Sequence, residues 1–141
     1  MSIHERVRTL PVVSPVAIGT TGTGQTGAII DRKGYDGVEF IIAIGAITST
    51  AAVFTTTIKE GDVTGTLTSV ADADLLGTEA LAGLGAATRT DGTGDKLTRR
   101  IGYKGTKRYV QANIKSTATA GTLVAITALM HSPSYAPTDN P

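Results

Sequence analysis

The sequence of 141 residues contains no cysteine and no tryptophan, and it has only two phenylalanines. Without cysteine, disulfides and thiolate metal sites are excluded. Because aromatic side chains bury the largest single areas, the core must be built from Val, Ile, Leu and Ala. The sequence also lacks a run of about 18 apolar residues, and its start lacks the apolar stretch of a signal peptide. We therefore expect synthesis in a host cytoplasm and no membrane partner.

A large excess of charge of either sign is missing as well. Thirteen basic and twelve acidic residues leave a formal net charge of +1. Such a balance provides no long-range field that would draw the protein onto nucleic acid or an anionic membrane. The composition therefore predicts no nucleic-acid partner.

Glycine and threonine are abundant, and this balance favours strands joined by turns over helices. Short apolar runs are separated by turn residues at the spacing of antiparallel β proteins. These runs occupy residues 16–18, 28–31, 38–44, 53–60, 66–70, 99–103, 109–115 and 122–130. The pattern predicts an all-β protein, an antiparallel β-sandwich of about eight strands.

Both ends of the chain differ from this pattern. Residues 1–15 contain two prolines and show no period, which predicts an extended N-terminal arm. We expect deletion of residues 1–12 to leave the fold intact. Residues 16–131 form the predicted sandwich domain, and residues 132–141 form a Pro-rich C-terminal tail, extended or mobile. Within the domain, the glycine-rich segment 72–95 predicts a loop with fragments of structure.

The last strand carries apolar residues on both faces. Val124, Ile126, Ala128 and Met130 alternate with Leu123, Ala125, Thr127 and Leu129. Such a strand is expected to be covered on both sides, by a second sheet and by a loop or a partner.

Residues 99–114 predict a β-hairpin, in which Gly105 would supply the positive φ of a tight turn. Its basic and aromatic residues are Arg99, Arg100, Tyr103, Lys104, Lys107, Arg108 and Tyr109. A solvated sheet face is the usual explanation of such a cluster. The tyrosines could instead stack on bases, or the patch could meet an acidic surface of a protein partner.

Motifs for chemistry are weak. Residues 22–27 match G-x-G-x-x-G, but no helix fits after them, so we expect a β-β loop without a dinucleotide. Residues 91–95 resemble part of a calcium loop yet fall short of an EF-hand. The only histidines, His4 and His131, lack further metal ligands. We expect no enzyme activity, no metal and no cofactor; an Asp and a Ser beside His131 in a pocket would revive the enzyme hypothesis.

Four segments carry a resemblance to a known family. Residues 34–48, residues 54–62 followed by 70–77, and residues 101–110 resemble, in this order, segments of small virion proteins of tailed bacteriophages, the capsid cement or decoration (head-stabilising) family. The resemblance covers roughly residues 34–130, and it departs at residues 62–65, where Asp-Val-Thr-Gly replaces a more acidic run.

The resemblance implies a jelly-roll β-sandwich located in the virion. Such proteins bind the capsid exterior, bridge subunits of the major capsid protein and stabilise the shell, commonly as a homo-oligomer (dimer or trimer). We expect Arg6 and Arg8 of the arm to reach a neighbouring subunit. The full set of candidate interface residues is Arg6, Arg8, Arg100, Tyr103, Lys104, Lys107, Arg108 and Tyr109.

Two other functions remain open. The sandwich could be a binding module for carbohydrate or a host surface, although four tyrosines and no tryptophan are a poor supply of the aromatic platforms that sugars need. It could also be a structural protein of the tail or neck.

Overall fold

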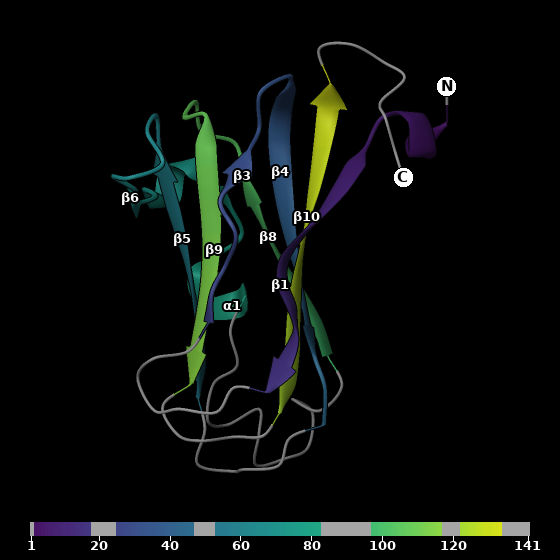
Figure 1. The fold of residues 1–141 in the computed structure, drawn as a ribbon, viewed down its shortest axis with the longest axis vertical. Coiled ribbons are helices and arrows are strands. Elements are labelled where there is room, and N and C mark those ends of the chain that lie inside the picture. Colours follow the sequence, from purple (N-terminus) through teal and green to yellow (C-terminus); the bar gives the residue numbers. More distant parts are fainter. Residues whose placement is uncertain (1, 18–24, 47–52, 83–96, 117–121, 134–141) are drawn as a thin grey trace.

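The computed structural model describes residues 2–17, 25–46, 53–82, 97–116 and 122–133. These residues form two antiparallel sheets that face each other (Figure 1). The first sheet has the order β1 (Arg8–Ala17), β10 (Leu123–Pro133), β4 (Tyr35–Ile44), β8 (Leu97–Tyr103) and β7 (Leu75–Leu76). The second has the order β2 (Gln25–Thr26), β9 (Tyr109–Ser116), β5 (Phe54–Gly61) and β6 (Thr68–Ser69), and β3 (Ile30–Asp31) also pairs with β9.

The chain alternates between the two sheets. It runs from β1 in the first sheet to β2 and β3 in the second, returns for β4, crosses again for β5 and β6, and returns for β7 and β8 before β9 and β10. This interleaving is the strand order of a jelly roll. The predicted all-β antiparallel sandwich is therefore confirmed.

The core lies between the sheets and follows the period of two in each strand. In β4, Val38, Phe40 and Ile42 are all 0% exposed. Phe54 of β5 faces them from the second sheet and is 2% exposed. Full burial of each such side chain contributes about 1.5–3 kcal/mol, so aliphatic rows compensate for the scarcity of aromatic residues.

The predicted hairpin of residues 99–114 is wrong. Strand β8 pairs with β4 and β7, whereas β9 pairs with β2, β3 and β5. Residues 104–108 therefore cross from one sheet to the other. The apolar alternation determines which face of each strand is buried but does not select its neighbour. Gly105 does not adopt a positive φ. Its lack of a side chain instead lets Tyr103 lie close to it, because a Cβ on residue 105 would lie 2.4 Å from the Tyr103 hydroxyl.

The predicted N-terminal arm of residues 1–15 is wrong from residue 8 onward. Arg8–Ala17 forms β1 and pairs with β10, and Val12 and Val13 are each 6% exposed in the core. The prolines are accommodated because β1 is an edge strand whose register shifts between Pro11 and Val13 and between Val13 and Val16. Of the described residues, 2–7 precede the sheet, and they include the 3-10 turn η1 (Ile3–Glu5).

The described part of the 72–95 segment, residues 72–82, contains short fragments, as predicted. They are η2 (Asp72–Asp74), β7 and α1 (Glu79–Ala82). The α1 turn covers the free edge of β5: the Ile58 N–H donates to Glu79 Oε1 at 2.6 Å, and Thr56 Oγ1 donates to the Ala82 carbonyl at 3.0 Å. An edge satisfied in this way offers less to another chain.

Several predictions concern residues outside the described ranges. They are the loop glycines at 22 and 24, the Asp-rich turn at 91–95 and the tail from residue 134 onward.

Among the helices that the structure describes, none is long and apolar enough to cross a membrane.

Candidate functional site

The eight candidate interface residues do not form one surface. Five of them lie at or beside the crossover from β8 to β9: Tyr103, Lys104, Lys107, Arg108 and Tyr109. Arg100 projects from the middle of β8, where its side chain is 81% exposed. Arg6 and Arg8 lie where the chain enters β1, at the far edge of the first sheet. That these eight residues contact a partner remains a prediction.

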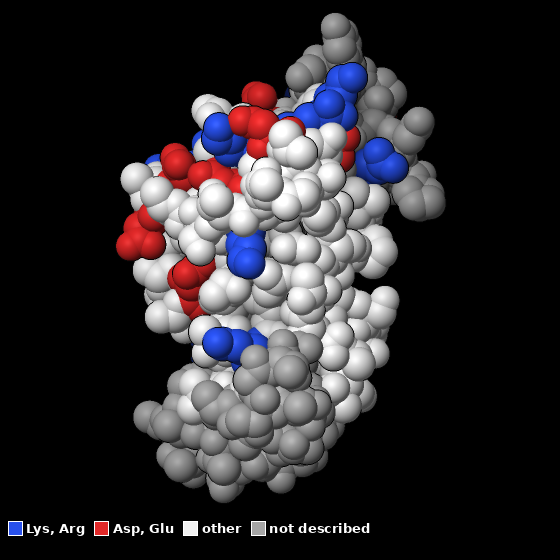
Figure 2. Space-filling model, turned by 60° about the vertical axis from the view of Figure 1, so that its left-hand side comes forward, with Lys and Arg blue, Asp and Glu red and all other residues white. Residues whose placement is uncertain are grey.

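The crossover belongs to a charged end of the sandwich, at the top of Figures 1 and 2, where most of the charged atoms visible in Figure 2 gather. Three segments build it: residues 31–36, 60–62 and 103–109. We call the charged end the set Asp31, Arg32, Lys33, Asp36, Glu60, Asp62, Lys104, Lys107 and Arg108.

Two ion pairs tie the three segments together. Arg108 donates from Nε and Nη2 to the two oxygens of Asp31, at 2.9 and 2.8 Å, and Lys107 Nζ donates to Asp62 Oδ2 at 2.7 Å. The hydrogen bond from Arg108 holds the pKa of Asp31 below its usual value, and the hydrogen bond from Lys107 does the same for Asp62. These cations are therefore already engaged within the chain.

Tyr103 anchors the crossover from below. Tyr103 is 1% exposed. Its hydroxyl donates to Glu60 Oε2 at 2.5 Å and accepts a hydrogen bond from the Lys107 N–H at 3.0 Å. Burial first, and the hydrogen bond to Glu60 second, raise the pKa of this phenol well above its usual value. The ring also has the Arg32 guanidinium 5.4 Å from its centroid. Tyr103 is thus a structural residue, and its buried ring is not available to stack on a base.

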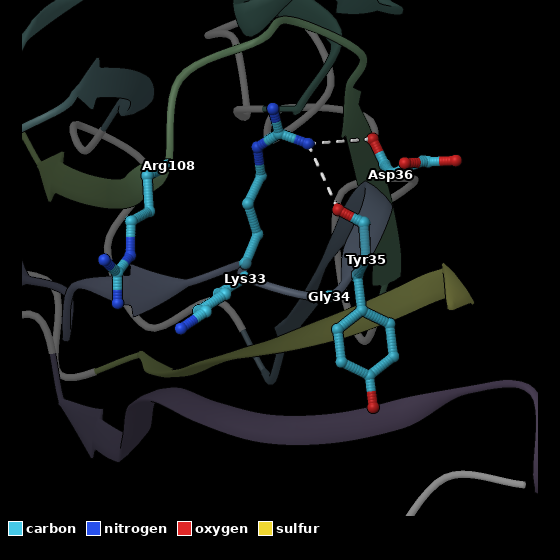
Figure 3. A pocket seen from close by; sticks show the side chains of 6 residues that line it. Lys33, Gly34, Tyr35, Asp36 and Arg108 are labelled. Carbon is cyan, nitrogen blue, oxygen red and sulfur yellow. Dashed lines mark hydrogen bonds between the residues drawn. The ribbon is translucent and has the colours of Figure 1, made fainter. Parts of the chain in front are cut away.

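A pocket of about 400 Å³ opens beside this crossover (Figure 3). Its lining residues are Arg32, Lys33, Gly34, Tyr35, Asp36 and Arg108. Gly34 turns the chain with a φ of +89°, a conformation that side-chain-bearing residues rarely adopt. Among these residues, sequence reasoning found only Arg108. The available signal was the Arg-Lys doublet directly before a turn glycine.

The outer face of the first sheet is a different surface. We define it by the outward residues of the three central strands: Glu39, Ile41, Ala43, Thr98, Arg100, Leu123, Ala125, Thr127 and Leu129. The register places Thr127, Ile41 and Arg100 side by side across the sheet. In this set only Glu39 and Arg100 carry charge, and they lie 3.9 Å apart.

The expected cover on both sides of β10 is present on one side. Val124, Ile126, Ala128 and Met130 are buried between the sheets, at 0–1% exposure. The outward row is partly exposed, and Leu123 reaches 58%. The described residues thus leave an apolar row facing outward.

The outer face of the second sheet is polar by comparison. Its outward residues include Thr55, Thr57, Lys59, Asn113 and Lys115. These side chains line a hollow of about 190 Å³ together with Gln25, Thr26 and Ile114. The two faces of the sandwich therefore offer different chemistry to a partner.

Of the two histidines weighed for catalysis and metal binding, His4 lies in η1 and His131 lies near the end of β10, in the same outward row as Leu129. His131 packs against Gly37 on the neighbouring strand, and its Nδ1 lies 3.1 Å from Ser132 Oγ. Within the described ranges, no group of three or more His, Asp or Glu residues could hold a metal ion. That the chain is neither an enzyme nor a cofactor protein stays a prediction.

Fold and surfaces together define a jelly-roll β-sandwich whose charge is concentrated at one end. No protein-family model matches the chain, and no curated protein does. Among solved structures, it is similar to the CBM22-1 xylan-binding domain of Paenibacillus barcinonensis Xyn10C, with a TM-score of 0.50 and 11% identity over 90% of this chain and 87% of that one.

Two further structures are similar in fold. One is the SPBc2 prophage-derived protein YomS, with a TM-score of 0.45 and 15% identity over 87% of this chain and 96% of that one. The other is a chain of infectious bursal disease virus strain Gx, with a TM-score of 0.46 and 12% identity over 94% of this chain and 33% of that one. At these identities the likeness concerns the fold alone.

Proposed function

We propose that this chain is a structural virion protein that binds the outside of a tailed-phage capsid and cements neighbouring subunits of the major capsid protein. The resemblance noted in the sequence supports the proposal. Its four segments fall on β4, on β5, on η2 with β7, and on the passage from β8 to β9. Strands β4 and β5 are central in their sheets, whereas β7 is an edge strand of the first sheet. The jelly-roll fold that the resemblance implies is the fold of the chain.

The outer face of the first sheet is the observation on which the proposal mainly rests. Ile41, Leu123 and Leu129 present apolar surface there, and charge is limited to Glu39 and Arg100. Protein interfaces have a core depleted of charged residues and a polar rim. This face has that composition, so we assign it to contact with capsid subunits or with further copies of the chain.

Stabilisation of the capsid shell would follow from the coupling between binding of this chain and assembly of the shell. A protein that binds the assembled shell but not free subunits favours the shell by RT ln(1 + [L]/Kd), about 2.7 kcal/mol for each site at a hundredfold excess over Kd. Many symmetric copies multiply this contribution. A dimer or trimer would add contacts without requiring a larger domain.

The N-terminal residues 2–7 are the part of the expected arm that lies outside the sheets. They contain Arg6, and Arg8 follows at the first position of β1. We propose that this shorter segment contacts a neighbouring subunit. Its removal tests the arm without removing core residues.

The decisive experiment uses the virion itself. Antibody against the chain should label the heads of intact particles, and the purified chain should co-sediment with heads that lack it. The variant Ile41→Lys places a charge on the outer face of the first sheet and should abolish co-sedimentation. Thr57→Lys places the same charge on the opposite outer face and serves as the matched control. Labelling of tails alone, or equal binding by both variants, would contradict the proposal.

A carbohydrate-binding module is the second candidate. The hollow on the second sheet favours it, because hydroxyl and amide groups such as Thr57, Asn113 and Gln25 suit sugar hydroxyls. The lining contains no aromatic ring to serve as a platform. A glycan-array signal that Thr57→Lys removes and Ile41→Lys preserves would establish this candidate over the first.

A further inference from the structure

The pocket beside the crossover holds more positive charge than its own carboxylates neutralise. Three of its lining side chains are cationic: Arg32, Lys33 and Arg108. Two carboxylates accompany them, Asp36 in the lining and Asp31 on Arg108. Figure 3 shows the Asp36 carboxylate directed away from the pocket, and the Lys33 side chain running toward the side of Arg108. One positive charge is left in surplus.

Arg32 is held in place by carbonyl oxygens. Its Nε donates to the Lys107 carbonyl, and its Nη1 donates to the carbonyls of Tyr35 and Asp36 at 3.2 and 3.1 Å. Carbonyl oxygens fix the guanidinium but leave its net charge uncompensated. The position of this cation therefore exists before any ligand arrives, which lowers the cost of ordering on binding.

Two further donors remain around the cavity. Arg108 uses Nε and Nη2 for Asp31, so its Nη1 is left with no partner among the residues that the structure describes. Lys33 is exposed, and its ammonium group makes no ion pair within those residues. Each of these donors can turn toward an anion in the pocket.

We propose that this pocket binds a single carboxylate group presented by an acidic segment of a protein partner. The surplus of one charge matches one carboxylate, and the cavity of about 400 Å³ accommodates one or two side chains with Tyr35 as a wall. A nucleic acid fits less well, because the whole chain carries a net charge of only +1 and the Tyr103 ring is buried. The inference concerns the isolated chain and does not rest on the virion role.

The test is a titration of the full-length ¹⁵N-labelled chain with an N-acetylated, C-amidated peptide Gly-Gly-Glu-Glu-Gly-Gly at low salt. We expect saturable shifts of the amides of residues 32–36 and 108, with a Kd on the order of 1 mM. The Gln-Gln counterpart of the peptide should leave these amides unmoved. Added salt should weaken binding, because exposed charges are screened.

Matched variants locate the site. Lys33→Gln should weaken the peptide about threefold, the range of one exposed charge pair. Lys104→Gln removes another exposed cation of the same charged end that does not line the pocket, and it should leave the affinity unchanged. Both variants should keep the wild-type thermal midpoint. Equal loss in the two variants, or no loss in Lys33→Gln, would overturn the assignment.

Two competing ligands provide the remaining outcomes. Inorganic phosphate that shifts the same amides at lower concentration than the peptide would overturn the carboxylate specificity. A single-stranded oligonucleotide that binds more tightly than the peptide would overturn the choice of a protein partner. Weaker effects from both support the proposal.

Discussion

Replacing Tyr103 with Phe removes one oxygen atom from the point where the crossover meets the second sheet. The hydroxyl donates to Glu60 and accepts the Lys107 N–H, so its loss leaves a carboxylate and a backbone donor without their partner. The ring itself keeps its place, because Phe has the same shape. The variant therefore isolates the polar contribution of Tyr103 to the connection between the sheets.

The expected cost follows from these two contacts. A hydrogen bond to a charged group contributes about 1.5–3 kcal/mol, and an unsatisfied buried donor costs about 1–3 kcal/mol. Glu60 is partly exposed and water can solvate it in the variant, which lowers the sum. We expect Tyr103→Phe to reduce the free energy of unfolding by about 2 kcal/mol, equivalent to a fall in Tm of roughly 4–8 °C for a domain of this size.

Urea denaturation followed by circular dichroism measures the effect. The control is Tyr109→Phe, because Tyr109 is half-buried beneath the Arg108 guanidinium at 5.0 Å and its hydroxyl makes no hydrogen bond within the described part of the chain. The control should change stability by less than about 0.5 kcal/mol. Equal stability of the two variants would refute the dependence of the crossover on the Tyr103 hydroxyl.

Three further predictions concern other parts of the chain. Gly105→Ala should destabilise the protein, since its Cβ would lie 2.4 Å from a tyrosine hydroxyl, whereas Gly65→Ala meets nothing within 4 Å and should be neutral or stabilising; thermal melts compare the two. Deletion of residues 2–7 should leave the Tm nearly unchanged, but deletion of residues 2–12 should lower stability by at least about 2 kcal/mol because a buried valine and half of an edge strand are lost. The pKa of Asp31 is lowered in the folded state, so its contribution is present above its ordinary value of 3.8 and disappears as the pH falls through the folded-state pKa. Wild type should therefore lose stability between pH 5 and the acid limit more steeply than Asp31→Asn, and parallel curves would contradict the ion pair.

The strands could be predicted because apolar and polar side chains alternate along them with a period of two. The rows through Phe40, Phe54 and Ile126 mark one buried face each, and the structure places all three in the core. Residues 8–15 were missed since proline normally signals a break. An edge position with two register shifts removes that penalty, and neither feature is visible in a single strand's sequence.

Pairing between strands could not be predicted with the same success. The run before Gly105 and the run after it look like the two arms of a hairpin, yet they belong to different sheets. The crossover between the two sheets is held by Tyr103, whose hydroxyl accepts a hydrogen bond from the Lys107 N–H. A contact of this kind depends on the distance between the two sheets, which no local pattern encodes.

The candidate site shows the same division. Basic residues near the crossover were found from their density, but density does not distinguish an ion-paired cation from an unpaired one. Lys107 and Arg108 are bound to Asp62 and Asp31, residues that are more than forty positions away in the chain. Arg32 and Lys33 form a doublet far from the crossover in the sequence, and neither makes an ion pair within the described ranges.

The charged end and the outer face of the first sheet are therefore two surfaces with separable tests. Ion pairs hold Lys107 and Arg108, two of the five cations at the charged end, and carbonyl oxygens fix Arg32. The capacity that we propose for a partner there is one carboxylate in one pocket. The outer face has the opposite character, an apolar row with a single ion pair at Arg100. If both surfaces work independently, Ile41→Lys should abolish binding to heads and leave the peptide titration intact, while Lys33→Gln should weaken the peptide about threefold and leave binding to heads intact. A variant that removed both activities would instead indicate one continuous contact that wraps from the sheet face onto the end of the sandwich.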